Sequence, residues 1–127
     1  MFGKKKISIL IPCLNERQGL DFVLRTLPDF IDEAVVVDNG SSDKSRDIAK
    51  KYHARLLTEE VKGYGRALSK GLKNVTGDII AIIDADGSYS TEDLGKICAF
   101  MESGDFDFIS GCRFPLDNRE AMPFANR

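Results

Sequence analysis

The chain has 127 residues, of which 43% are hydrophobic and 30% are charged, and its formal net charge is −2. This size and composition are typical of one soluble domain that is large enough to bury a core. The nearly neutral charge gives no electrostatic reason to expect a nucleic acid partner, and no apolar stretch approaches the ~20 residues of a membrane-spanning helix. We therefore expect a single domain over residues 1–127, with no nucleic acid partner and no transmembrane segment.

The cysteines and the N-terminus bear on localisation. Cys13, Cys98 and Cys112 form no CxxC pair, and an odd count suits a reducing compartment, so we expect buried free thiols in a cytoplasmic protein. The start "MFGKKKISILIP" has lysines ahead of an apolar run, as a secretory signal does. The run is short and no small-residue cleavage site follows it, so it is better interpreted as a first strand.

Strand and helix patterns alternate along the chain. In order, we predict a strand over residues 6–11, a helix over 16–27, a strand over 34–37, a helix over 43–52, a strand over 55–57, a helix over 65–75, a strand between Gly77 and Gly87, a helix over 91–101 and a strand over 106–110. Residues 41–43 are predicted to cap the second helix and Thr91 the fourth. This order predicts an α/β fold with a mostly parallel sheet and helices on both faces.

Polar loops follow three of the predicted strands. They are "PCLNE" after the first strand, "DNGSSD" after the second and "DADG" after the fourth. Ligands of such folds bind at the carboxyl ends of the strands, so we expect the three loops to converge on one crevice. The run "IIAII" before "DADG" is aliphatic throughout, which predicts a strand buried on both faces.

Two carboxylates, Asp84 and Asp86, end that fourth strand. Side chains of an extended segment alternate with period two, so both lie on one side. Carboxylates this close repel each other unless a cation bridges them, and a hard divalent ion, Mg²⁺ or Mn²⁺, would also recruit a diphosphate. The alternative is a plain turn at Asp86 and Gly87, with Asp84 capping it.

The stretch "KGYGRALSKG" is rich in glycine but is not a dinucleotide fingerprint. The third glycine of that motif would fall at Leu68, and the motif would have to follow the first strand. What remains is a helix start that carries Lys62 and Arg66, where backbone N–H groups and two cations could meet a phosphate. A solvated helix face is an equally good interpretation.

Four stretches together resemble a known family. "ISILIPCLNE", "EAVVVDNGSSDKS", "KGYGRALSKGLKNVTGDIIAIIDADGSYSTEDL" and "FDFISGCRF" are similar, in order and spacing, to a family 2 glycosyltransferase, and most of all to dolichyl- or polyprenyl-phosphate sugar transferases. The resemblance implies a Rossmann-like GT-A fold and an inverting glycosyltransferase. It also implies a UDP- or GDP-sugar donor, Mg²⁺ or Mn²⁺, and a polyprenyl phosphate acceptor at the cytoplasmic face of a membrane.

The resemblance also assigns residues to the nucleotide. They are Pro12, Leu14, Asn15 and Glu16 in the first loop and Val37, Asp38 and Asn39 at the second strand. Glu16 would accept hydrogen bonds from ribose hydroxyls. Asn39 stands where the family often has a second Asp that contacts the base, and its amide could both donate and accept there.

The same resemblance assigns the metal and the diphosphate. Asp84, Ala85 and Asp86 would form the metal-bound DxD motif, with Asp86 as the direct ligand and Asp84 reaching the ribose or the ion. Arg113 in "GCRF" matches a family arginine near the diphosphate and the acceptor phosphate, which its bidentate fork would suit. A structural salt bridge is the alternative role for Arg113.

Family members commonly continue well beyond this length, so we expect this sequence to be the N-terminal, donor-binding part, without the acceptor-binding part. Two alternatives remain open at this point. One is a non-catalytic nucleotide-binding fragment of such an enzyme. The other is a haloacid-dehalogenase-type phosphatase with Asp84 as nucleophile and Asp86 as acid/base. The later lysine that such a phosphatase needs could only be Lys96.

Overall fold

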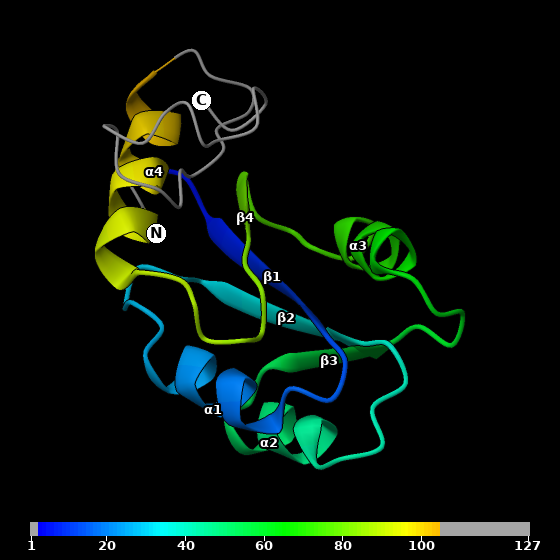
Figure 1. Ribbon diagram of the computed structural model, residues 1–127. Coiled ribbons are helices and arrows are strands. Elements are labelled where there is room, and N and C mark those ends of the chain that lie inside the picture. The colour runs from blue at the N-terminus through cyan, green and yellow to red at the C-terminus, as the bar shows by residue number, and fades with distance from the viewer. Residues whose placement is uncertain (1–2, 105–127) are drawn as a thin grey trace, which may run out of the picture.

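The computed structural model describes residues 3–104 (Figure 1). In chain order its elements are β1 (Ile7–Cys13), α1 (Arg17–Arg25), β2 (Glu33–Asp38), α2 (Ser45–Lys51), β3 (Arg55–Thr58), α3 (Tyr64–Leu72), β4 (Ile79–Ile82) and α4 (Thr91–Ser103). The predicted alternation of strands and helices is confirmed over this range. The strand expected at 106–110 lies outside the described residues.

The described strands form one parallel sheet in the order β3-β2-β1-β4. Ile9 of β1 lies opposite Ala34 of β2 on one side and Ala81 of β4 on the other. The chain therefore moves outward from β1 through β2 to β3, and then returns to the opposite side of β1 with β4. The order reverses next to β1, and such a reversal places a ligand crevice at the carboxyl ends of the strands.

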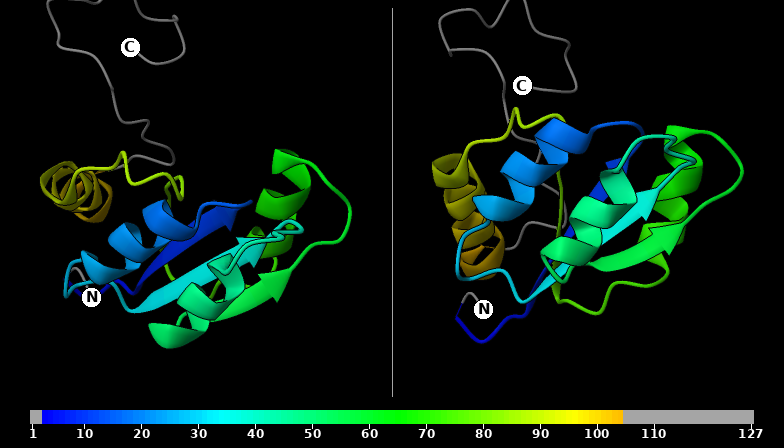
Figure 2. Two further views of the ribbon diagram at one scale, coloured as in Figure 1. Left: turned by 60° about the horizontal axis from the view of Figure 1, so that its bottom comes forward. Right: turned by 90° about the horizontal axis from the view of Figure 1, so that it is seen from below.

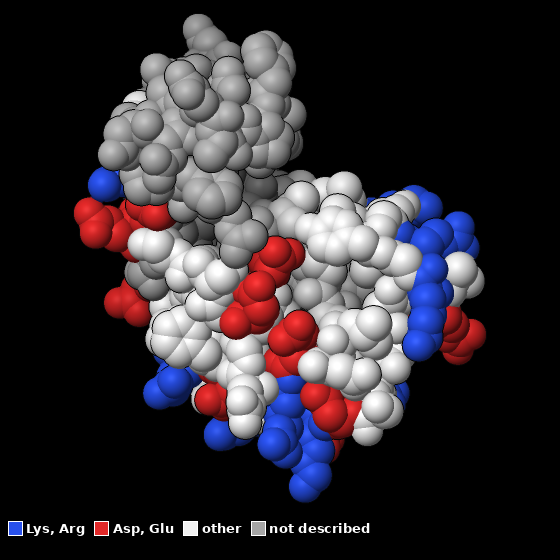
Figure 3. Space-filling view, in the orientation of Figure 1, with Lys and Arg blue, Asp and Glu red and all other residues white. Residues whose placement is uncertain are grey.

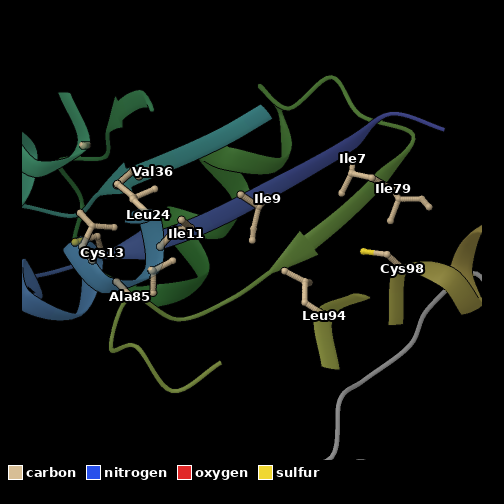
Figure 4. Close-up of a cluster of buried hydrophobic side chains, with 13 residues drawn as sticks. Ile7, Ile9, Ile11, Cys13, Leu24, Val36, Ile79, Ala85, Leu94 and Cys98 are labelled. Carbon is tan, nitrogen blue, oxygen red and sulfur yellow. The ribbon is translucent and has the colours of Figure 1, made fainter. Parts of the chain in front are cut away.

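Helices cover both faces of the sheet (Figure 2). The larger core cluster packs α1, α2 and α4 on one face, where Leu20, Val23 and Leu24 form the buried stripe of α1 (Figure 4). Their spacing of three and four residues puts them on one side of the helix. The smaller cluster packs α3 on the other face, through Ala67 against Leu10 of β1 and neighbouring valines of β2. This arrangement explains why β1 is apolar except at Ser8, whose hydroxyl is satisfied by Glu33.

The prediction that the fourth strand is buried on both faces is wrong. Ile79 of β4 is buried, but Ile80 and Ile82 are 39% and 43% exposed. The reason is that α3 packs on β1 and β2 and, among the described residues, leaves this face of β4 uncovered. The hydrophobic run therefore predicted the strand but not its partners.

Helix ends differ slightly from the predictions. Ser90, and not Thr91, caps α4, because its side chain accepts a hydrogen bond from the N–H of Asp93. The prediction that residues 41–43 cap the second helix is wrong, because the N-cap of α2 is Lys44, which makes no side-chain cap. Asp43, one residue earlier, accepts the N–H of Ser45 at 2.9 Å. The helix predicted to reach residue 75 ends at Leu72.

Candidate functional site

The loops after β1 and β2 are held together by Asn15. The backbone N–H of Asn15 donates to Oγ of Ser41 at 2.9 Å, and its Oδ1 accepts the N–H groups of Ser42 at 2.7 Å and Asp43 at 3.2 Å. Asn15 has φ of 51°, a left-handed conformation that Asn tolerates better than most residues. The side chain and the backbone of Asn15 thus both contribute to the predicted convergence of these two loops.

The start of α1 is satisfied by the β2 loop as well. Glu16, the residue before α1, makes no side-chain cap of its own. Instead the N–H of Glu16 donates to Oγ of Ser45 at 3.2 Å, and the N–H of Arg17 donates to Oδ2 of Asp43 at 3.2 Å. The hydrogen bond from Ser45 holds the pKa of the Asp43 carboxyl below its ordinary value. Sequence reasoning missed this role of Asp43 and Ser45, although the missing cap at Glu16 was a signal for it.

Asp38 organises the turn that follows β2. Its side chain is only 1% exposed, and its carboxylate accepts the N–H groups of Gly40 at 3.3 Å and Ser41 at 3.2 Å. Nε of Arg46 lies 3.6 Å from Oδ2 of Asp38. Gly40 has φ of 99°, which an L side chain would adopt only under strain. Asp38 thus shapes the second-strand loop from within.

The DxD segment is anchored by its middle residue. Ala85 is 3% exposed and belongs to the core cluster that contains Ile11 and Leu24 (Figure 4). Asp84 and Asp86 on either side of it are exposed to solvent. Oδ1 of Asp86 accepts the N–H of Ser88 at 3.0 Å, which holds the turn. Burial of Ala85 therefore presents both carboxylates at the surface.

One side of α1 supports the loop that carries these aspartates. A Cβ placed on Gly19 would lie 2.8 Å from Cα of Asp86, so the loop passes directly over this glycine. At the C-terminal end of α1, the hydroxyls of Tyr89 and Thr26 are 2.7 Å apart, and the Tyr89 hydroxyl also donates to the carbonyl of Val23. Gly19, Val23 and Thr26 lie at helical spacing on one face. Sequence reasoning missed Gly19 and Tyr89, which carry no motif of their own.

The three loops enclose an open groove of about 800 Å³. Its lining comes from the β1 loop and α1, from the β2 loop and from the β4 loop: Asn15, Glu16, Arg17, Gln18, Gly19, Phe22, Asp43, Asp86 and Gly87. Figure 3 shows acidic side chains gathered on this face of the molecule. The structure therefore brings Glu16 and Asp86 into one groove, as expected from the order of the strands.

The start of α3 reaches the same edge of the sheet. The pKa of Tyr64 lies above its ordinary value because its hydroxyl is partly desolvated and because the charge of Asp84 opposes its ionisation. Lys62 is exposed and its side chain passes over Gly40, since a Cβ placed there would lie 3.8 Å from Cε of Lys62. Nε of Arg66 lies 3.6 Å from Oε1 of Glu59. Arg66, which was predicted to meet a phosphate, is therefore already paired with a carboxylate.

The remaining residues assigned to the nucleotide differ in exposure. Leu14 is exposed, Pro12 is partly buried, and Val37 is fully buried in the cluster under α3, so only the main chain of Val37 could meet a ligand. The amide of Asn39 binds protein groups, which are described below. Arg113 lies outside the described residues.

The two DxD carboxylates suit a hard divalent cation only if a bound diphosphate supplies further oxygen ligands. Among residues 3–104, no group of three or more His, Cys, Asp or Glu side chains is arranged to hold a metal ion. Asp84 and Asp86 offer two exposed carboxylates, and Mg²⁺ is commonly held by one or two carboxylates together with water and substrate phosphates. The residues present therefore fit a metal that arrives with a diphosphate.

A parallel sheet with helices on both faces and polar loops at its carboxyl ends defines an α/β domain of the kind that binds nucleotides at this edge. The sequence profile described as "Glycosyl transferase family 2" matches residues 8–119. The chain therefore belongs to glycosyl transferase family 2, and the resemblance found in the sequence is confirmed. Membership of this family favours the glycosyltransferase interpretation over the phosphatase.

Curated relatives extend well beyond this chain. An uncharacterized glycosyltransferase of Mycobacterium tuberculosis is 38% identical over 110 residues, which are 87% of this chain and 50% of the relative. A dolichyl-phosphate hexose transferase of Haloferax volcanii is 32% identical over 124 residues, covering 95% of this chain and 53% of the relative. The chain thus spans about half the length of these relatives.

Solved structures confirm the GT-A fold. Glucosyl-3-phosphoglycerate synthase of Mycobacterium tuberculosis, solved with Mn²⁺, UDP and glucosyl-3-phosphoglycerate, superimposes with a TM-score of 0.71 at 25% identity. The match covers 80% of this chain and 41% of the synthase. Within the described residues, no helix is both long and apolar enough to cross a membrane.

Proposed function

We propose that this chain is the donor-binding part of an inverting glycosyltransferase that uses a nucleoside-diphosphate sugar. The observation that carries the proposal is the groove in which the loops after β1, β2 and β4 meet, with Glu16 and Asp86 in its lining. Glu16 accepts hydrogen bonds from the ribose hydroxyls, and the exposed DxD carboxylates face the diphosphate. UDP, which glucosyl-3-phosphoglycerate synthase binds, is the favoured carrier, and GDP is the alternative.

The chain's own residues hold and orient the donor. The network around Asn15 and Asp43 fixes the first two loops, and Gly19 supports the DxD loop, so that ribose and diphosphate meet a preformed surface. Asp86, with Asp84, would hold Mg²⁺ or Mn²⁺. When bound, the ion neutralises the charge that builds on the departing nucleoside diphosphate. Lys62 adds positive charge at the same edge.

The acceptor is a polyprenyl phosphate. Support comes from the relatives named as dolichyl- and dolichol-phosphate sugar transferases. In the reaction, a phosphate oxygen attacks the anomeric carbon, the bond from that carbon to the diphosphate breaks, and the nucleoside diphosphate leaves with the electron pair. A phosphate oxyanion is already ionised, so no general base is required. This proposal places the full protein in the cytoplasm at a membrane surface.

Labelled donors test the proposal. The chain is incubated with radiolabelled UDP- and GDP-sugars, Mn²⁺ and a polyprenyl phosphate in detergent. We expect label in the lipid fraction, or slow release of free sugar from the donor. Donor binding with neither transfer nor hydrolysis would support the second candidate, a nucleotide-binding part that is inactive alone, which the match to only half of the relatives favours.

A further inference from the structure

Asn39 joins three segments at the edge of the crevice. Its backbone N–H donates to the carbonyl of Cys13 at the end of β1, at 2.9 Å. Its side-chain Nδ2 donates to the carbonyls of Glu59 at 2.9 Å and Val61 at 3.0 Å, and its Oδ1 accepts the N–H of Gly63 at 2.9 Å. Asn39 is only 6% exposed but the loop residues that it binds lie at the surface, so these hydrogen bonds are partly shielded from water.

The side-chain amide of Asn39 therefore directs both of its hydrogens and its oxygen to a single loop, residues 59–63. The loop over residues 59–63 carries Lys62 and ends at Gly63, where α3 begins. Gly63 has φ of 142°, a conformation that the bond from its N–H to Asn39 helps to define. Because Lys62 passes over Gly40, the loop fixed by Asn39 sets where this cation stands relative to the β2 loop.

We propose that Asn39 is a positioning residue for the donor: its carboxamide fixes the 59–63 loop so that Lys62 faces the diphosphate, and it makes no contact with the nucleobase. We call the hydrogen bonds between the Asn39 carboxamide and the 59–63 loop the latch. The inference rests on the proposed function for the identity of the ligand, whereas the latch is seen in the chain itself. A base contact would require Asn39 to give up buried hydrogen bonds, which is costly.

The latch needs an amide and not a carboxylate at this position. In Asn39→Asp, the atom that faces the carbonyls of Glu59 and Val61 changes from a donor to an acceptor. Two acceptors then face each other in a site with little water, and the loop must move away. Asn39→Ala removes the same bonds without adding charge.

Hydrogen exchange of the free chain tests the latch without any ligand. We expect the amide of Gly63, which donates to Asn39, to exchange about tenfold faster or more in both Asn39 variants, since loss of the hydrogen bonds that hold the loop lowers the cost of local opening. Asn74→Asp is the matched control, because Asn74 donates its amide to the carbonyl of Lys70 on the far part of α3. Unchanged exchange of the Gly63 amide in the Asn39 variants would overturn the latch.

Nucleotide titration with Mn²⁺ then tests positioning through Lys62. We expect Asn39→Ala to weaken affinity about tenfold in the native chain but less than about twofold in a Lys62→Ala background, while its loss of thermal stability is the same in both. If Asn39→Ala weakens nucleotide affinity as much in the Lys62→Ala background, and by different factors for UDP and GDP, Asn39 contacts the nucleobase and the proposal is overturned. If the native chain binds no nucleotide, the proposed function fails, and hydrogen exchange still decides the latch.

Discussion

Gly19 of α1 lies directly beneath Asp86, so closely that a Cβ on this glycine would be 2.8 Å from Cα of the aspartate. The same Cβ would also meet the carbonyl oxygen of Ala85. Both obstacles are backbone atoms, which cannot rotate away as a side chain can. The DxD loop can therefore pack this closely on α1 only because residue 19 has no side chain.

Gly19→Ala should displace the DxD loop. We expect metal-dependent nucleotide affinity to fall about tenfold or more, because a shift of ~1 Å in a positioned group can cost two orders of magnitude in function. Calorimetric titration with UDP and Mn²⁺ measures the effect. Gly95→Ala in α4 is the matched control, since within residues 3–104 a Cβ there would meet Phe30 at 3.8 Å, an ordinary contact. Equal affinities in the two variants would show that Gly19 does not position Asp86.

Tyr89→Phe should loosen the far end of the same loop. The change removes the hydroxyl that lies 2.7 Å from Oγ1 of Thr26, and we expect a loss of about 1 kcal/mol in unfolding free energy with a weaker affinity for Mn²⁺ and nucleotide. Tyr52→Phe is the control, because its hydroxyl donates to Asp21 at 2.7 Å between α1 and α2. The control should lose similar stability and keep its affinity. A Tyr89 variant with native affinity would contradict the supporting role.

The sequence predicted the elements and the loops of the site because both depend on local patterns. Patterns of apolar residues predicted β1 and α1, and polar residues after three of the strands pointed to the crevice. Gly19 could not be identified in the same way, since its importance comes from a backbone that follows 66 or more residues later and is brought over it only by the fold. The partners of Asn39 likewise lie 20 or more residues further along the chain, and only the fold brings them to it.

Glu33 should make stability depend on pH. Burial opposes its ionisation, but hydrogen bonds from Ser8 and Thr76 outweigh this and hold its pKa below the ordinary value of 4.5. A lowered folded-state pKa contributes stability that is fully present above the unfolded value and is lost as the pH falls through the folded value. Glu33→Gln should therefore cost about 1 kcal/mol at pH 7, and less below about pH 4.

Urea unfolding of both chains between pH 3 and 7 measures this difference. Glu92→Gln serves as the control, because Glu92 is 79% exposed and, among the residues that the structure describes, forms an ion pair with Lys96 one turn away. An exposed pair of this kind is worth little, so its replacement should change stability by less than about 0.5 kcal/mol at any pH. A constant difference for Glu33→Gln across the range would contradict the assigned pKa.

The uncovered face of β4 shows where sequence patterns fail in a different way. A run of aliphatic residues predicts burial, but the burial of Ile80 and Ile82 depends on which elements pack there. In the described part of the chain α3 leaves them exposed. The aliphatic run predicted the strand correctly, but only the structure could show which elements pack on each of its faces.

The most direct test of the account is calorimetric titration of the chain with UDP and with GDP, each with and without Mn²⁺. We expect one nucleotide to bind only when Mn²⁺ is present, and we expect Asp86→Asn to abolish this binding. Asp29→Asn, an exposed change remote from the groove, should leave it intact. Affinity that is equal with and without Mn²⁺, or unchanged in Asp86→Asn, would contradict the claim that the DxD carboxylates hold the metal that holds the diphosphate.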